Sequence, residues 1–302
     1  MMAYIHLFIS VSLPILIICT CGALLQKKQP IDTKMLANIS LYILAPALIL
    51  SALSQSHLKG SNVLHIFAFS LIMTAVLWLL AVVAAKWMHL SEGSKRALTL
   101  TLVFSNANNY GLPVLLLAFG QSGFSLGAIY VIGQIILVNV LGSYIASRAE
   151  MSGKAALVHI VKSPLIYASL IGFLFAFLQL PLPSGMDTAA QMLGAAYPVL
   201  VLLILGIKLG HTRLAGIRRL DVWGGVLLRL LLVPLIAKGV LFLLGIHGML
   251  ASVLFVEVSM PAAVNSVMLI EKFNGDSELA SLIVTLTTVL SFIYLPFLIR
   301  IG

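Results

Sequence analysis

The chain carries the sequence FSNANNYGLP at residues 104–113 and the sequence FVEVSMPAAVN at residues 255–265. Each lies in an apolar stretch that is long enough to cross a bilayer, and each places polar groups and a proline near the middle of that crossing. A helix broken at membrane depth is tolerated only where it faces protein or a water-filled cavity. Matched interrupted segments in the two halves of a chain point to the binding site of a transporter.

The composition is that of a membrane protein. Of the 302 residues, 61% are hydrophobic and 9% are charged, whereas a soluble domain carries about 25% charged residues. The mean hydropathy is +1.13 and the pI is ≈ 9.7. We therefore predict an all-α polytopic protein of the lipid bilayer. The basic pI reflects the Lys and Arg of cytoplasmic loops and does not indicate nucleic-acid binding.

A search for apolar runs of about 20 residues predicts ten membrane spans. Their approximate ranges are 6–25, 36–54, 63–85, 97–119, 125–147, 163–180, 188–209, 222–244, 250–270 and 279–300. Of the 18 Lys and Arg residues, fourteen fall in the loops that follow odd-numbered spans, and two, Lys59 and Arg300, fall on the opposite side. Because cytoplasmic loops are rich in Lys and Arg, both termini are predicted to lie on the outer (periplasmic) side of the cell inner membrane.

Prolines recur at matching places in the two halves of the chain, at offsets of 150, 152 and 148 positions: Pro14 and Pro164, Pro46 and Pro198, and Pro113 and Pro261. With five spans in each half, the second half must insert upside down relative to the first. The sequence thus predicts an inverted-topology repeat, the construction of many secondary transporters. The predicted repeats are residues 1–150 and residues 151–302.

The sequence has no signature of enzymatic or metal chemistry. It contains no nucleotide-binding loop, no H-E-x-x-H pattern and no nucleophile elbow. Cys19 and Cys21 are two positions apart on a predicted helix and are interpreted as apolar packing residues. The histidines do not have the spacing of metal ligands. We therefore predict that the protein is not an enzyme and that it needs no cofactor and no metal.

The sequence resembles the auxin efflux carrier family, specifically its short microbial members, over essentially its whole length. The resemblance is strongest in residues 104–113 with Phe119-Gly120, and in MPAAVNS at 260–266 leading to EKFNGDSEL at 271–279. LYILAPAL at 41–48 and SPLIYA at 163–168 also match family positions. In the plant carriers a long hydrophilic loop joins the two halves, whereas about 15 residues, 148–162, connect them here.

The resemblance implies ten helices in two inverted five-helix repeats, with an architecture like that of the sodium–bile acid symporters. Spans four and nine would be broken and would cross at their breaks to form the substrate site. Spans one, two, six and seven would form a scaffold that makes a homodimer, and spans three to five and eight to ten would form the moving transport unit. The substrate class implied by the family is a small organic acid.

Amide side chains dominate the first broken segment, and amides both donate and accept hydrogen bonds. The half-helix that begins near Pro113 directs free N–H groups into the break, where a carboxylate fits. Alternatively, the amides only cap the broken helix. The predicted substrate-binding residues, the second group by inverted symmetry, are Asn106, Asn108, Asn109 and Pro113, and Ser259, Pro261 and Asn265.

Two charged residues lie inside predicted spans at similar depth, about 10 Å from the outer surface. Glu257 is the one acid well inside a span, and such a residue is a functional candidate. We predict that it forms a coupling charge pair, or shares a hydrated cavity, with Lys238; alternatively, Lys238 extends alone to the interface. Arg229 either extends to the cytoplasmic interface or contacts the anion. Gln134 and Asn139 either bond neighbouring helices or line the pathway.

The sequence therefore predicts a secondary active transporter of small organic anions, such as mono- or dicarboxylates, that works by alternating access around the crossing. One alternative is a sodium-coupled symporter of the bile acid type, although a single intramembrane acid argues against sodium. A second alternative is a membrane sensor without transport. An intramembrane enzyme is disfavoured because the predicted spans hold neither paired aspartates nor a Ser–His dyad.

Overall fold

The computed structural model describes residues 2–29, 31–54, 60–147, 164–211 and 215–302, and every regular element in these ranges is helical. Among the described residues, seven helical segments are long and apolar enough to cross a membrane. They are Tyr4–Lys28, Thr33–Ser54, Gly60–Trp87, Ala107–Ala146, Ser184–Gly210, Leu220–Leu243 and Ser277–Ile301. The all-helical membrane architecture predicted from the sequence is confirmed, and the boundary at 150/151 lies outside the described residues.

The first half contains the following elements, in which η marks a π-helical turn: α1 (Met2–Leu7), η1 (Phe8–Ser12), α2 (Leu13–Lys28), α3 (Thr33–Ile39), η2 (Ser40–Leu44), α4 (Ala45–Ser54), α5 (Gly60–Trp87), α6 (Glu92–Val103), η3 (Ala107–Gly111), α7 (Leu112–Leu137), η4 (Val138–Gly142) and α8 (Ser143–Ser147). The second half contains α10 (Pro164–Phe177), α11 (Ser184–His211), α12 (Leu220–Leu227), η5 (Leu228–Leu232), α13 (Val233–Leu243), α14 (Gly248–Val258), α15 (Val264–Lys272) and α16 (Ser277–Ile301).

The long helices and the ten predicted spans differ in number for a physical reason. The segment Ala107–Ala146 contains the end of the predicted span 97–119 and the predicted span 125–147, and a kink at Gly120, with φ 64° and ψ −160°, divides two helices inside α7. The predicted spans 97–119 and 250–270 are each interrupted. The predicted span 163–180 is represented by the shorter apolar helix α10.

Prolines explain most of the π-helical turns. Four of the described turns end two residues before a proline, namely before Pro14, Pro46, Pro113 and Pro234. Proline has no N–H, and its ring crowds the carbonyl four residues earlier. A wider turn relieves this crowding, and such turns occur frequently at functional sites.

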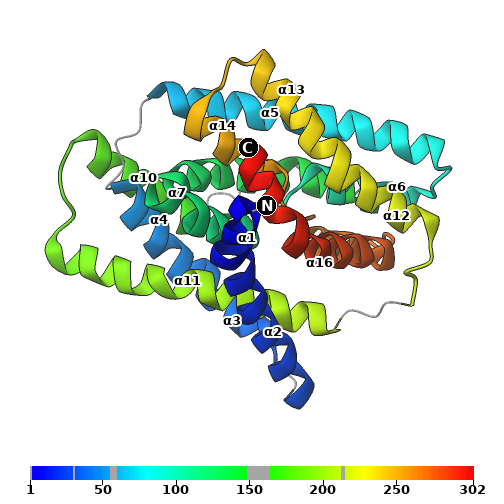
Figure 1. The fold of residues 1–302 in the computed structure, drawn as a ribbon, viewed down its shortest axis with the longest axis horizontal. Helices are drawn as coiled ribbons and strands as arrows, with labels where there is room; N and C mark the ends of the chain where they lie inside the picture. Colours follow the sequence, from blue (N-terminus) through cyan, green and yellow to red (C-terminus); the bar gives the residue numbers. More distant parts are fainter. Residues whose placement is uncertain (1, 30, 55–59, 148–163, 212–214) are drawn as a thin grey trace.

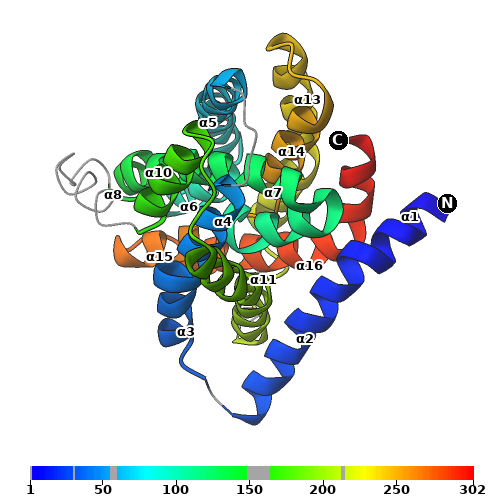
Figure 2. The ribbon, with the colours of Figure 1, turned by 90° about the vertical axis from the view of Figure 1, so that its left-hand side faces the viewer.

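The helices pack in two groups. The first group consists of α2, α4, α10 and α11, in which α11 packs along both α2 and α4 (Figure 1). Gly22 and Gly206 permit the close approach of α2 and α11, since a Cβ at Gly206 would meet the main chain of Cys19. In the second group α5 packs on α6, α7 on α14, and α15 on α16. Figure 2 shows α1 and α2 as one oblique rod along the edge of the molecule.

Asp276 ties three helix ends of the second group together. Its carboxylate accepts hydrogen bonds from Ser94 Oγ at 2.8 Å, from Arg219 Nη2 at 2.7 Å and from the N–H of Leu279 at 2.9 Å. Burial acts to raise the pKa of Asp276, but the hydrogen bonds from Arg219, Leu279 and Ser94 outweigh it and lower the pKa below its ordinary value. The starts of α6, α12 and α16 are thereby held in one ionic cluster.

Candidate functional site

The two broken segments cross and pair at their breaks. The N–H of Asn106 donates to the carbonyl of Pro261 at 2.8 Å, and the N–H of Ala263 donates to the carbonyl of Phe104 at 3.0 Å. Ser105 and Ala262 form the antiparallel bridge between these two bonds. The predicted meeting of the interrupted stretches is therefore present, in the form of a two-strand contact between chain segments about 150 positions apart.

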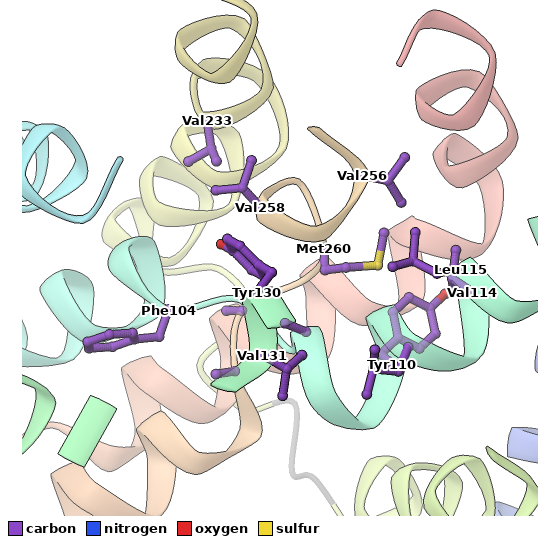
Figure 3. Close-up of a cluster of buried hydrophobic side chains, with 14 of the residues drawn as sticks. Phe104, Tyr110, Val114, Leu115, Tyr130, Val131, Val233, Val256, Val258 and Met260 are labelled. Carbon is purple, nitrogen blue, oxygen red and sulfur yellow. The ribbon is translucent and has the colours of Figure 1, made fainter. Parts of the chain in front are cut away.

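The main-chain N–H and C=O groups that lack helical partners at the breaks form hydrogen bonds with neighbouring helices, as an apolar environment requires. The N–H of Ala262 donates to Thr287 Oγ1 at 3.2 Å. Tyr294 Oη donates to the carbonyl of Ser259 at 3.2 Å, and Ser266 Oγ donates to the carbonyl of Leu100 at 3.2 Å. Figure 3 shows the buried side chains of Tyr130 and Met260 that surround the crossing.

Arg229 on η5 donates more hydrogen bonds to the main chain around the breaks than any other described side chain. Its guanidinium donates to the carbonyl of Leu102 at 2.5 Å, to that of Val258 at 2.8 Å and, from two nitrogens, to that of Met260 at 2.7 and 3.0 Å. The side chain is 0% exposed. The alternative that Arg229 extends to the cytoplasmic interface is therefore wrong, because three main-chain carbonyls at the breaks hold the side chain in the interior, and its contact with the anion stays a prediction.

The three asparagines of the first break occupy different environments. Asn106 is buried, and its Nδ2 has no hydrogen-bond partner among the described residues. It stands at the N-cap position of η3 without a side-chain capping bond, so the alternative of simple capping does not describe it. Asn108 accepts a hydrogen bond from Tyr197 Oη at 2.8 Å, and its Nδ2 donates to Asn109 Oδ1 at 3.3 Å.

A cleft of about 610 Å³ opens beside the crossing. Asn109 from the first break and Asn265 from the second both line it, together with Val264 at the start of α15. The opposite wall comes from α3, η2 and α11 and includes Lys34 and Lys208. An adjoining pocket of about 440 Å³ shares part of this lining and extends to α16. The cleft thus lies between the two packing groups.

The remaining substrate-binding candidates, Asn106 and Asn108 included, are not on the cleft wall. Ser259 is 0% exposed, and its Oγ has no partner among the described residues. Pro113 is buried near the start of α7, and Pro261 is buried in the second break, where its carbonyl accepts the bond from Asn106. These residues shape the crossing, and their contact with substrate stays a prediction.

Glu257 lies at the end of α14 beside the crossing and is 0% exposed. Neither carboxylate oxygen has a hydrogen-bond partner among the described residues. Gly111 and Gly127 leave the space that the carboxylate fills. Tyr130 and Tyr197 lie near this carboxyl group.

The predicted pair of Glu257 and Lys238 is not formed in this structure. Lys238 Nζ donates to the main-chain carbonyls of Ile301 and Gly302 and lies 4.5 Å from the centre of the Phe255 ring. No ion pair joins Lys238 to Glu257 in the parts of the chain that the structure describes. The similar depth of the two residues along their helices did not account for the direction in which each side chain points.

Gln134 and Asn139 also lie outside the cleft. Asn139 Nδ2 donates to the carbonyl of Ile135, four residues earlier, at 2.8 Å. Gln134 is buried, and its Oε1 has no partner among the described residues. A place for either residue on the transport pathway stays a prediction.

Several residues of the site were missed in the sequence, among them Tyr197, Lys34 and Lys208. Tyr197, on α11, joins the first packing group to the crossing through Asn108, and its only signal was its position before the repeated Pro198. Lys208 was counted as a cytoplasmic loop charge, although it lies within α11 and lines the cleft.

The contact between Gly111 and Glu257 gives a first prediction. A Cβ at Gly111 would lie 2.8 Å from Glu257 Cδ and 3.0 Å from Oε1. We expect Gly111→Ala to destabilise the protein by about 1–3 kcal/mol through overpacking. The measurement is thermal unfolding of the purified protein. Gly239→Ala is the matched control, since a Cβ there meets nothing within 4 Å; equal melting temperatures for the two variants would contradict the tight contact.

Comparison with known proteins agrees with this architecture. The profile of a family described as "Membrane transport protein" matches residues 7–299. An uncharacterized transporter of Methanothermobacter thermautotrophicus is 27% identical over 267 residues, which cover 88% of this chain and 87% of that protein. The uncharacterized transporter MJ1031 of Methanocaldococcus jannaschii is 25% identical over 269 residues, which cover 85% of this chain and 86% of that protein.

Proposed function

We propose, from the premise that this chain belongs to the auxin efflux carrier family of membrane transport proteins, that it is a secondary carrier of small organic anions. Membership of that family makes it a multi-pass membrane transporter and not an enzyme. The observation that carries the proposal is the placing of Asn109 and Asn265, one from each break, on the wall of one cleft.

The chemistry of the cleft suits a carboxylate. The N-terminus of α15, at Val264, opens onto it, and the first N–H groups of a helix lack intrahelical partners and carry a partial positive charge. Asn109 and Asn265 add amide donors, and Lys208 adds a cation on the facing wall. Backbone N–H groups at a helix N-terminus are a recurrent site for anions.

The size of the cleft agrees with a small substrate. Its volume of about 610 Å³ falls within the range of about 300–1,000 Å³ found for small-molecule sites. Asp32 is the one acid that lines it within the described residues. Mono- and dicarboxylates are therefore the proposed class.

The two packing groups supply the moving parts of the proposed cycle. The group of α2, α4, α10 and α11 consists of helices from the predicted spans one, two, six and seven, which supports their proposed role as the scaffold, and we propose that the group containing the crossing is the transport unit. We propose that the chain consists of two inverted repeats, each of which contributes helices to both packing groups. We also propose that the scaffold forms a homodimer and that both termini lie on the outer side of the membrane. In that orientation the cleft, with Lys34 and Lys208, opens toward the cytoplasm.

Binding of the substrate tests the proposal. We expect the purified protein to bind one or more members of a panel of mono- and dicarboxylates. We expect Asn109→Ala and Asn265→Ala each to weaken that binding about 10-fold or more, because a hydrogen bond to a charged group is worth about 1.5–3 kcal/mol. Isothermal titration gives the affinities. Gln191→Ala, an exposed amide on α11 outside the cleft, is the control.

Three results separate the alternatives. Affinities that are unchanged in both asparagine variants would place the site elsewhere. Binding that requires sodium would favour the symporter of the bile acid type. Binding without uptake into proteoliposomes would favour a sensor.

A further inference from the structure

The C-terminal ends of two half-helices meet at a single side chain. Leu102 is the penultimate residue of α6, Val258 is the last residue of α14, and Met260 follows in the second break. The carbonyls of all three accept hydrogen bonds from the Arg229 guanidinium. Arginine suits this place because its planar fork carries five donors and always keeps its charge.

Crossing two broken helices creates an electrostatic conflict. Each break brings together one helix N-terminus, with about half a positive elementary charge, and one C-terminus, with about half a negative charge. The two N-termini, at η3 and α15, favour an anion, whereas the two C-termini, at α6 and α14, repel it. By itself the crossing therefore has no preference for either sign of charge.

We propose that Arg229 sets the charge selectivity of the crossing by acting as a resident cation at the two C-terminal ends. This inference rests on the proposed function. With the carbonyl ends of α6 and α14 neutralised, the N-terminal ends dominate the field of the site, and an anion is favoured. Without Arg229 the same carbonyls form a cage of hard oxygen ligands, which attracts a cation.

The surroundings of Arg229 support this role. The side chain is 0% exposed, so solvent does not screen its charge. In the described part of the chain it makes no ion pair, and its bonds go to main-chain carbonyls. Tyr294 donates to the carbonyl of Ser259 beside the cage. The positive charge of Arg229 therefore interacts with the carbonyl groups at the two helix ends and is not paired with an acidic side chain among the described residues.

The test compares two replacements that differ in charge. Arg229→Lys keeps the charge and loses the fork, and Arg229→Gln keeps donors and loses the charge. We expect Arg229→Gln to bind the organic anion at least about tenfold more weakly than Arg229→Lys, since the charge offsets two helix ends. Arg300→Gln, at an exposed position near the end of α16, is the control and should match the unaltered protein.

A second measurement does not depend on the substrate. Millimolar guanidinium chloride, with sodium chloride at equal ionic strength as the reference, is added to each variant during thermal unfolding. We expect saturable stabilisation by guanidinium in Arg229→Gln and in Arg229→Ala, and none in the unaltered protein or in Arg300→Gln. In Arg229→Gln, guanidinium should also restore anion affinity.

The outcomes separate the two proposals. Equal anion affinity in Arg229→Gln and Arg229→Lys would overturn the role of Arg229 in selectivity. An absence of saturable guanidinium stabilisation in both neutral variants would overturn the cation cage, even if the anion affinities differ. If the unaltered protein binds none of the organic anions while guanidinium still stabilises the neutral variants, the proposed function fails and the cation cage stands.

Discussion

Asn106→Ala is expected to weaken the binding of the organic anion about 10- to 150-fold, because a hydrogen bond to a charged group is worth about 1.5–3 kcal/mol. The Asn106 side chain is buried at the crossing, behind the wall of the cleft in this conformation, and its Nδ2 is an unpaired donor within the described structure. Its main-chain N–H, which holds the second break through Pro261, is retained in the variant. We therefore expect normal expression and a melting temperature close to that of the unaltered protein.

Titration of the purified protein with the best-bound carboxylate gives the affinity. Asn106→Asp sharpens the test, because a carboxylate at this position repels an anion and should abolish binding at neutral pH. Gln191→Ala is the control, since Gln191 is an exposed amide outside the cleft. If Asn106→Ala binds as tightly as the unaltered protein, the amide has no part in the site.

The location of the crossing was predictable from the sequence because its signal is local. A proline and a run of amides stand out in an apolar background, and they mark a break at membrane depth wherever they occur. The structure places both marked stretches at one crossing. The pairing of their main chains, through Asn106 and Ala263, did not require any particular side chain and so had no signature in the sequence.

The partners of the buried charges were not predictable in the same way. Arg229, Lys238 and Glu257 each stand alone in an apolar run, and depth along a helix does not give the direction of a side chain. Arg229 and Lys238 are bound to main-chain carbonyls, which every residue possesses and which no sequence pattern distinguishes. The charge pair that depth alone suggested for Glu257 and Lys238 is therefore not formed in this structure.

The positions at which helices are interrupted could not be predicted from the apolar runs. A kink at Gly120 divides two helices inside α7, and the non-helical residues 104–106 and 259–263 divide two predicted spans. Apolar runs record how much of the chain lies in the membrane. They do not record where a helix stops within it.

Glu257→Gln is expected to leave the fold and anion binding intact and to abolish any dependence of transport on a pH gradient. An isolated buried carboxylate is costly unless it is paired or neutralised, and Glu257 has no hydrogen-bond partner within the described structure. We propose that Glu257 binds a proton in the conformation seen here and releases it when the crossing is exposed to the other side. Glutamine has the same shape and is always neutral, so it imitates the protonated acid and blocks the exchange.

Uptake into proteoliposomes at two external pH values, with melting temperatures measured alongside, distinguishes this role from a structural one. Had Glu257 neutralised Lys238, removing its charge would cost about 3–5 kcal/mol of stability. Because Lys238 is bound to the carbonyls of Ile301 and Gly302, we expect no such loss. Glu271→Gln, an exposed acid on α15, serves as the control. A stable Glu257→Gln variant whose transport still responds fully to the pH gradient would show that this carboxyl does not carry the coupling proton.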